Sequence, residues 1–394
     1  MKLRHWRYDL ALRHSWAIAT DVREGAVTGK SVYPVVFAEL TDSQGRSGIG
    51  EGSPSSQYQE SHATVAEFLG QVNPDRLSFD DIEGSMAYLE SVAPGRYPAK
   101  CALNLALLDG AAKAAGRSVH DYLGLGFSEG RHVTSFTIGI DSPEKMAAKT
   151  AEAVAAGLPV LKLKLGGPRD RENFAAVRGA APGAAIRVDA NAAWKTPDEA
   201  LRNIEWVAED GNVQFVEQPM PPQHSESDWA WLKERSPLPL IGDESYQSAA
   251  DAEACAQRFH GVNVKFVKTG GITAGKAALE AARRRGLKTM LGCMIESSVL
   301  ISAGAHLAEL TDFLDLDGNI LITNDPYDGV QTRNGIMGFA AVATKTGLGC
   351  SPVANLPTTS RTRTHPPPHG WVHSLSGNKN APLLRAGHFA KFRT

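Results

Sequence analysis

A regular repeat of strand-like segments limits the folds open to this chain more than any other feature. Eight short apolar, β-prone segments are centred near Phe136, Leu163, Val188, Val216, Ile241, Lys265, Leu291 and Leu316. Their spacing of roughly 24 to 28 residues is the length of one strand, one helix and two short loops. The repeat therefore predicts an α/β barrel of the (β/α)₈ type, whose functional side chains gather at the carboxyl ends of the strands. A doubly wound open sheet is the alternative, but the chain lacks the glycine-rich phosphate loop that such sheets carry.

Helix signals fill the intervals between the strand-like segments. Ser142 and Pro143 begin an alanine-rich helix that we expect to reach Gly157, because serine is a good N-cap and proline suits the first helical position. Thr196 and Glu199 form a capping-box pattern at the start of another helix. Three further helices, each opening on a serine or threonine, are expected at 248–259, 273–285 and 297–310.

The first 130 residues have a different pattern. Alternating segments at 3–12 and 32–40 predict strands, with a hairpin turn at 42–45, and helical stretches follow near 61–72 and 100–115. The glycine- and serine-rich segment at 48–56 reads as a mobile loop. The sequence therefore predicts an α+β domain ahead of the barrel.

The last 44 residues, 351–394, form a basic tract. They hold six Lys or Arg and no Asp or Glu, so the rest of the chain carries a net charge of −8. Such a tract has little to bury, and we expect 351–394 to be a disordered basic tail, either an extension or the product of a shifted reading frame.

Composition excludes several classes of function. The net charge is −2 and the hydrophobic fraction is 42%, which gives no basic excess for nucleic acid and no apolar run long enough for a membrane. The amino-terminal residues lack the apolar core of a signal peptide. Four cysteines lie far apart without metal-ligand spacing, which favours reduced thiols and a cytoplasmic protein.

The segment from Val160 to Gly166 carries two lysines, Lys162 and Lys164, in an otherwise apolar strand. Side chains alternate between the faces of a strand, so both lysines point the same way. Burial lowers the pKa of a lysine and makes it a usable base near neutral pH. The alternative is an edge strand with lysines on its solvent face to oppose aggregation.

Three acids end the next three predicted strands. Asp189, followed by Asn191, ends the third strand, Glu217 ends the fourth and Asp243 ends the fifth. Three carboxylates at one barrel mouth repel one another strongly without a cation, and their oxygen atoms suit a hard ion. The sequence predicts one Mg²⁺ per subunit, held by Asp189, Glu217 and Asp243.

Lys164 on the second strand and Lys265 on the sixth lie on opposite sides of these carboxylates. A metal on a substrate carboxylate and two lysines on opposite faces favour proton abstraction from the adjacent carbon. One lysine then removes the proton and the other returns it to the opposite face. This chemistry includes racemisation, epimerisation, syn elimination and cycloisomerisation.

The motifs together resemble the enolase superfamily, specifically its muconate-lactonizing subgroup. They are Lys-x-Lys at 162–164, Asp189 with Asn191, Glu217 in Val-Glu-Gln-Pro, Asp243 in Gly-Asp-Glu-Ser and Lys265 in Lys-Phe-Val-Lys-Thr-Gly-Gly. The superfamily uses lysine bases with Mg²⁺. The resemblance implies a modified (β/α)₇β TIM-type barrel at 131–323, a capping α+β domain at 1–130 and a return to the cap at 324–350.

The same resemblance implies a role for each site residue. Asp189, Glu217 and Asp243 are the expected metal ligands, and Lys164 and Lys265 are the expected bases. Lys162 is expected to lower the pKa of Lys164 and to contact the substrate carboxylate. The residues expected to support the site from behind are Asn191, Lys268 and Glu244.

Within the subgroup, Asp315 and Asp317 on the eighth strand resemble the Asp-x-Asp of the dipeptide epimerases. An inward pair of acids suits the α-ammonium group of a dipeptide. The further expected substrate contacts are Thr137, Met294, Asp21 and Arg23. In the epimerases for L-Ala-D/L-Glu an arginine on the first capping loop pairs with glutamate. Arg23 is one candidate for that role, but Asp21 aligns nearer the position and favours a cationic or neutral side chain.

The resulting hypothesis is a Mg²⁺-dependent dipeptide epimerase that inverts the C-terminal residue through an enolate intermediate. The alternatives are an N-acylamino acid racemase or o-succinylbenzoate synthase, a muconate-type cycloisomerase, and a catalytically silent metal-binding barrel. The expected partner is a small dipeptide, without nucleic acid or membrane, and the resemblance is compatible with a homo-oligomer.

Overall fold

The computed structural model describes residues 1–23 and 26–354. These residues fall within one compact unit that runs from Met1 to Arg363. Of the predicted tail at 351–394, residues 355–394 lie outside the described residues. Among the described residues, no helix is long and apolar enough to span a membrane.

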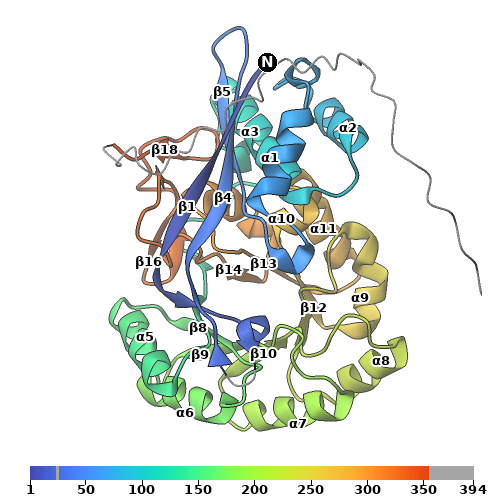
Figure 1. Cartoon of the computed structure of the whole chain (residues 1–394), viewed down its shortest axis with the longest axis vertical. Coiled ribbons are helices and arrows are strands. Elements are labelled where there is room, and N and C mark those ends of the chain that lie inside the picture. Colours follow the sequence, from blue (N-terminus) through green and yellow to red (C-terminus); the bar gives the residue numbers. More distant parts are fainter. Residues whose placement is uncertain (24–25, 355–394) are drawn as a thin grey trace, which may run out of the picture. The chain divides into compact units, whose positions relative to one another are not determined.

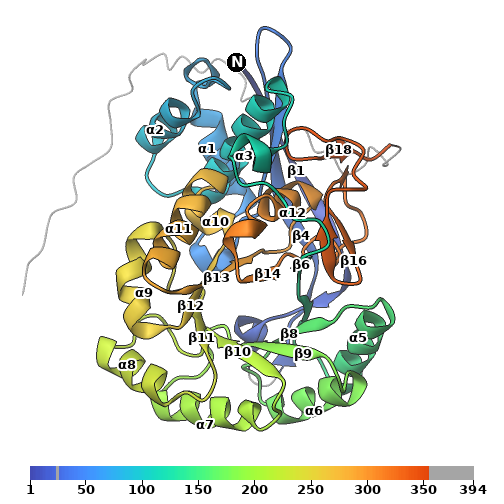
Figure 2. The same ribbon diagram turned by 180° about the vertical axis from the view of Figure 1, so that it is seen from behind.

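Eight parallel strands form the barrel sheet (Figures 1 and 2). They are β7 (Phe136–Ile138), β8 (Val160–Lys164), β9 (Ala185–Asp189), β10 (Val213–Glu217), β11 (Leu240–Gly242), β12 (Gly261–Val264), β13 (Lys288–Gly292) and β14 (Phe313–Asp315). Each strand pairs with its neighbour in chain order. The ring is completed beside β7, where the Ser135 amide donates to the Leu314 carbonyl at 3.1 Å.

Seven longer helices follow the first seven strands and surround the sheet (Figure 2). They are α5 (Pro143–Ala155), α6 (Asp170–Ala180), α7 (Pro197–Ala208), α8 (Glu226–Arg235), α9 (Ala252–Arg258), α11 (Ile272–Arg284) and α12 (Ser298–Ala305). A last strand without a helix of its own makes this a (β/α)₇β barrel, so the predicted fold class is confirmed.

Two of the predicted helix starts have the expected caps. Ser142 caps α5 by accepting a hydrogen bond from the Lys145 amide, and Thr196 caps α7 by accepting one from the Glu199 amide. The Thr196 capping box is only half formed, because the Glu199 carboxylate accepts from the Lys195 amide at 2.8 Å instead of from Thr196.

Two predictions about the segment after β12 are wrong. The sixth strand is predicted to be centred near Lys265, but β12 ends at Val264 and the residues after Lys265 form the short helix α10 (Phe266–Thr269). The next helix, α11, starts after Gly271 rather than at Thr273, and Gly271 has φ +117°, which a glycine adopts without strain. The Thr273 amide is drawn into a hydrogen bond with the Asn104 side chain of the cap at 3.1 Å.

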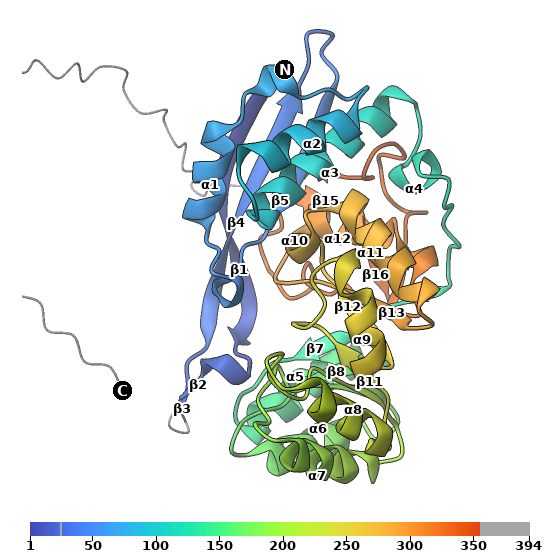
Figure 3. The same cartoon turned by 90° about the vertical axis from the view of Figure 1, so that its right-hand side faces the viewer.

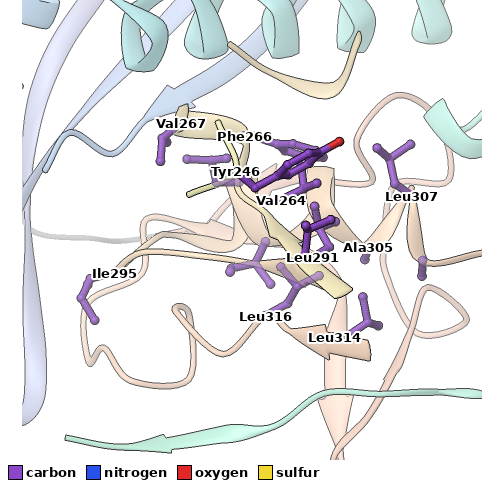
Figure 4. Close-up of a cluster of buried hydrophobic side chains, with 14 of the residues drawn as sticks. Tyr246, Val264, Phe266, Val267, Leu291, Ile295, Ala305, Leu307, Leu314 and Leu316 are labelled. Carbon is purple, nitrogen blue, oxygen red and sulfur yellow. The ribbon is translucent and has the colours of Figure 1, made fainter. Parts of the chain in front are cut away.

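Apolar side chains fill the space between the strands and helices. Figure 4 shows Val264, Leu291 and Leu314, which come from or border three neighbouring strands, in one buried cluster with Tyr246. The Tyr246 hydroxyl donates to the Ala278 carbonyl at 2.7 Å, which satisfies its polar group inside the core. Burial on both faces explains why these strands have nearly continuous apolar sequences.

The cap consists of an antiparallel sheet and three longer helices (Figures 1 and 3). Its sheet has the order β1 (Lys2–Trp16), β4 (Lys30–Thr41) and β5 (Ser47–Gly52). Its helices are α1 (His62–Gln71), α2 (Ile82–Val92) and α3 (Tyr97–Ala114), and α3 is buried from Pro98 to Ala112. A small hairpin of β2 (Val22–Arg23) and β3 (Ala26–Val27) lies between β1 and β4.

The expectation of a mobile loop at 48–56 is wrong for its first part, because Ser47–Gly52 is strand β5. Its glycines lie against the backbone of α3. A Cβ added at Gly48 would lie 2.0 Å from the Ala106 carbonyl oxygen, and one added at Gly50 would lie 1.9 Å from that of Ala102. The glycines therefore permit close strand–helix packing rather than flexibility.

The remaining elements are short, and they lie in the cap, in the barrel and in the segments that connect them. They are α4 (Val119–Tyr122), β6 (His132–Val133), β15 (Tyr327–Asp328), β16 (Gln331–Arg333), β17 (Ile336–Gly338) and β18 (Ser351–Pro352), with 3₁₀ turns at Ala19–Asp21, Ser56–Tyr58, Pro74–Arg76, Ala249–Asp251 and Ala308–Leu310. The predicted tail was expected to begin at residue 351, but β18 pairs with β15. Ordered backbone therefore continues past residue 350, because the edge of β15 is available for pairing.

Candidate active site

Lys162 and Lys164 lie on β8, between β7 and β9. Their side chains are 2% and 7% exposed, and both point into the barrel mouth where the carboxylates lie. The alternative of an edge strand with solvent-facing lysines is therefore wrong.

Asp189, Glu217 and Asp243 are brought together as the sequence predicts. Each sits at or directly after the carboxyl end of its strand, and all three are almost fully buried. One ligand oxygen from each lies within 4.8 Å of the others, and this is the one cluster of potential metal-binding side chains among the described residues.

The contacts of Lys162 test whether a cation fits here. Its Nζ lies 3.0 Å from Asp189 Oδ2, 2.8 Å from Glu217 Oε2 and 2.8 Å from Asp315 Oδ2. A buried carboxylate cluster of this kind requires positive charge, and its donors are all hard oxygens. The residues present therefore fit Mg²⁺.

Lys164 and Lys265 flank the carboxylates from two sides. Lys164 Nζ lies 2.6 Å from Asp189 Oδ2, and Lys265 Nζ lies 2.8 Å from Asp243 Oδ2. Lys268 lies behind Asp243, where its Nζ donates to the Asp243 backbone carbonyl at 2.6 Å and to the Asn263 carbonyl at 3.1 Å. Lys268 is thus held in place, whereas the other two lysines border the open cavity.

The carboxylates oppose the lowering of the pKa that burial alone would give Lys162 and Lys265. Burial alone would lower the pKa of Lys162, but Asp189, Asp315 and Glu217 outweigh it and raise the pKa well above its ordinary value. Lys265 behaves in the same way, with Asp243 raising its pKa against burial. Burial and the nearby Asp189 raise the pKa of Glu217 to about 7. The carboxylates thus favour the ammonium form of Lys162 and of Lys265 in this arrangement.

Asp315 and Asp317 have different partners. Asp315 accepts hydrogen bonds from Lys162 Nζ at 2.8 Å and from the Ser135 hydroxyl at 2.7 Å. Asp317 Oδ2 accepts from the Thr137 amide at 2.6 Å. Burial and the charge of Asp315 raise the pKa of Asp317 to about 6. Asp315 is thus neutralised by a lysine, whereas Asp317 has no cationic partner within ion-pair distance among the described residues.

Hydrogen bonds connect the predicted supporting residues to the cap. The Asn191 amide donates to Asp189 Oδ1 at 2.9 Å, and its side chain donates to Glu244 Oε1 at 3.3 Å. The same Glu244 oxygen accepts from Gln57 Nε2 of the cap at 2.7 Å. Sequence analysis could not select Gln57, because it lies 187 residues from Glu244 in the chain.

Asn263 is a further residue that the sequence analysis missed. It lies on β12, and its side chain donates to Glu217 Oε1 at 2.8 Å. A signal was available, because Asn263 and Lys265 are two residues apart and alternation places both on one face.

A cavity of about 260 Å³ opens between the barrel mouth and the cap. Predicted site residues on its lining are Lys162, Lys164, Lys265, Asn191, Asp315, Asp317, Thr137, Met294 and Asp21. Arg23 lies on the exposed β2–β3 hairpin and is not part of the lining. The cap contributes lining residues that the sequence analysis did not identify, among them Trp16, Lys30, Tyr33, Gln57, Glu60 and His62.

Two family descriptions match the chain. Residues 145–355 match the Enolase C-terminal domain-like family, and residues 14–124 match the mandelate racemase / muconate lactonizing enzyme N-terminal domain. The two matches cover both the barrel and the cap.

Similar proteins include two curated epimerases. The chain is 52% identical to the L-Ala-D/L-amino acid epimerase of Pedosphaera parvula, over 88% of this chain and 99% of that protein. It is 38% identical to the L-Ala-D/L-Glu epimerase of Bacteroides thetaiotaomicron, over 85% of this chain and 84% of that protein. Among solved structures, a dipeptide epimerase from Cytophaga hutchinsonii complexed with Mg and D-Ala-L-Val has a TM-score of 0.80. It is 25% identical and the match covers 90% of this chain and 96% of that one.

Proposed function

We infer the function from one premise, which is that this chain belongs to the enolase superfamily, in the family of mandelate racemase and muconate lactonizing enzyme. We propose that it is a Mg²⁺-dependent dipeptide epimerase that inverts the α-carbon of the C-terminal residue. The observation that carries this proposal is the arrangement of the cavity floor. Two lysines flank three carboxylates there, and the buried Asp317 lies beside them without a cationic partner among the described residues.

Asp189, Glu217 and Asp243 would hold the Mg²⁺. When bound, the ion supplies positive charge that stabilises negative charge developing on the substrate carboxylate. Lys162, Lys164 and Lys265 pair with these three carboxylates in this structure, and the ion would share their neutralisation.

Lys164 and Lys265 move the proton. One of them, as the free amine, takes the α-proton of the substrate, and the other, as an ammonium, gives a proton to the opposite face. The first lysine ends as an ammonium and the second as an amine, so the proton count is balanced and the configuration at the α-carbon is inverted. Contacts with Asp189 and Asp243 keep each Nζ directed at the barrel mouth.

Asp317 binds the α-ammonium group of the dipeptide. Asp315 already pairs with Lys162, so Asp317 is the acid of the two that offers its charge to an incoming cation. A bound ammonium group then favours the ionised form of Asp317 and fixes the position of the α-carbon between the lysines.

The test is exchange of the α-proton in D₂O. Purified protein with Mg²⁺ should add one mass unit to L,L-dipeptides, and EDTA should abolish the exchange until Mg²⁺ is restored. Exchange into N-acylamino acids but into no dipeptide would favour the racemase alternative. A folded protein that exchanges neither class of compound would indicate a catalytically silent barrel.

We also propose the domain division and location given by the sequence. The division is a cap at 1–130, a catalytic barrel at 131–323 and a return to the cap at 324–350. A cytoplasmic location is supported by the four cysteines, all of which are free thiols. Assembly into a homo-oligomer stays a prediction.

A further inference from the structure

The cap side of the cavity carries an ion pair that the sequence analysis did not anticipate. Asp21 Oδ1 lies 3.5 Å from Lys30 Nζ, and both residues line the cavity. Asp21 is 16% exposed and its other oxygen accepts from the Ile18 amide at 3.2 Å, whereas Lys30 is 48% exposed. Asp21, held in place by the Ile18 amide, is therefore paired with Lys30, the first residue of β4.

The other ionisable groups on this wall are also satisfied from within the cap. Glu60 lies 3.5 Å from Arg96 and accepts a hydrogen bond from the Thr64 hydroxyl. His62 Nε2 lies 2.9 Å from Arg7 Nη1, so His62 accepts the hydrogen bond as a neutral ring. Burial and the charge of Arg7 lower the pKa of His62, which keeps it neutral.

Apolar groups make up much of the remaining cap surface in the cavity. They include Trp16, Ile18, Val32, Tyr33, Pro34 and Pro54. Val32 is 45% exposed, and the Tyr33 hydroxyl donates to the Pro54 carbonyl at 2.9 Å, which satisfies that polar group within the cap. A ligand that covered this surface would gain free energy by removing apolar area from water.

The Asp21 turn lies close to one of the two bases. Gly166 follows Lys164 by two residues, and a Cβ added at Gly166 would lie 2.7 Å from the Cβ of Ala19. Ala19 and Asp21 are the first and last residues of a single 3₁₀ turn. In the binding mode proposed above, the carboxylate and ammonium of the dipeptide lie at the barrel floor, which leaves the side chain of its C-terminal residue to face the cap at this turn.

Resting on the proposed epimerase function, we propose that the Asp21–Lys30 pair sets the side-chain specificity of this site. The substrates are dipeptides whose C-terminal side chain is uncharged and mainly apolar. A glutamate or lysine side chain entering this wall must either compete for a partner that is already paired or lose water without replacement. An apolar side chain covers the exposed apolar surface and leaves the pair intact.

The test compares kcat/KM for L-Ala-L-Leu, L-Ala-L-Phe, L-Ala-L-Glu and L-Ala-L-Lys with the full-length protein and Mg²⁺. We expect the leucine and phenylalanine substrates to exceed the two charged ones by roughly tenfold or more. Asp21→Asn leaves Lys30 unpaired and should raise kcat/KM for L-Ala-L-Glu by roughly three- to tenfold. Lys30→Gln leaves Asp21 unpaired and should raise kcat/KM for L-Ala-L-Lys instead.

The double variant Asp21→Asn/Lys30→Gln carries no charge at this position and should recover the apolar preference. Glu39→Gln is the matched control, because it breaks the 3.0 Å pair between Arg4 of β1 and Glu39 of β4, which lies outside the cavity lining. It should leave the order of substrates unchanged.

The outcomes separate the two proposals. L-Ala-L-Glu or L-Ala-L-Lys as the best wild-type substrate would overturn the specificity inference while the epimerase function stands. The inference would also be overturned if Asp21→Asn did not raise kcat/KM for L-Ala-L-Glu and Lys30→Gln did not raise it for L-Ala-L-Lys. The absence of exchange with every dipeptide, for a protein that circular dichroism shows to be folded, would overturn the function and this inference together.

Discussion

Lys164 and Lys265 differ from the other buried lysines of the barrel mouth in what surrounds them. Lys162 is held by three carboxylates, and Lys268 is held by Asp243 and two backbone carbonyls. Lys164 faces Asp189 and the open cavity, and Lys265 faces Asp243 and the open cavity. The two lysines proposed as bases are therefore those whose ammonium groups are held by the fewest partners.

Removing either of the two proposed bases should affect proton exchange from one substrate epimer. Lys164→Ala should lower α-proton exchange from one epimer by roughly a hundred- to ten-thousandfold, and Lys265→Ala should do the same for the other epimer. Neither variant should interconvert the epimers. The measurement follows each purified epimer in D₂O by mass spectrometry and chiral chromatography. Lys145→Ala, which removes an exposed lysine of α5, is the control, and wild-type epimerisation by Lys164→Ala would contradict the two-base scheme.

Asp317 should contribute mainly to binding of the substrate amine. Asp317→Asn keeps a group that accepts from the Thr137 amide but removes the charge, so KM for dipeptides should rise by roughly ten- to a hundredfold. N-acetylated dipeptides, which lack the ammonium group, should be affected far less. An equal rise in KM for free and N-acetylated dipeptides would show that Asp317 serves the structure of the strand end instead.

At the scale of elements, close packing of β5 on α3 connects the cap sheet to a helix that is apolar around most of its surface. The alternate glycines of β5 bring the strand backbone against the carbonyls of α3. Helix α3 in turn contacts α10 and α11 of the barrel. The position of the cap loops over the cavity therefore depends on a contact that admits no side chain.

Gly50→Ala should disrupt this contact. The new Cβ would lie 1.9 Å from the Ala102 carbonyl oxygen, which is backbone and cannot turn aside. We expect a loss of about 3 kcal/mol in the free energy of unfolding, measured by denaturant titration. Gly70→Ala in α1 is the control, since its Cβ meets nothing within 4 Å and should leave stability unchanged or slightly raise it. Equal stability of Gly50→Ala and wild type would mean that the strand and helix can move apart.

At the scale of the whole unit, His306 connects three segments that are distant in the sequence. It follows α12 of the barrel, its Nδ1 accepts from the His120 amide at 3.3 Å and lies 2.8 Å from the His120 ring Nδ1, and its ring stacks on Phe339 at 4.5 Å. His120 belongs to the connection between cap and barrel, and Phe339 belongs to the return after the last barrel strand. Burial and His120 lower the pKa of His306 to about 3.

This histidine should make stability depend on pH. Between pH 6.5 and 3 the unfolded state binds a proton at His306 and the folded state does not, so the free energy of unfolding decreases as the pH falls through that window. The contribution of His306 is a loss of about 2 kcal/mol between pH 7 and pH 5. Chemical unfolding at both pH values measures it. His306→Phe should remove that part of the pH dependence, whereas His14→Gln, at an exposed pair with Glu152, should not. The same pH dependence in His306→Phe as in wild type would assign the effect to other groups.

The sequence by itself determined the parts of this protein that depend on short-range pattern. The repeat of strand and helix predicted the barrel, because alternation and helix caps are local. The ends of strands predicted Asp189, Glu217, Asp243 and the lysines, because parallel strands deliver their carboxyl ends to one mouth. Glycine spacing was misread at β5, since a pattern of small residues does not say whether space or a helix lies opposite.

Only the tertiary structure decided which groups neutralise one another. Lys162 is paired with Asp315 across 153 residues, Gln57 contacts Glu244 across 187, and Lys30 rather than Arg23 faces the cavity beside Asp21. The pKa shifts, the lack of a cationic partner for Asp317 among the described residues, and the Asp21–Lys30 pair all depend on distances between side chains from different elements. No local pattern contains those distances, because they are set when the cap packs on the barrel.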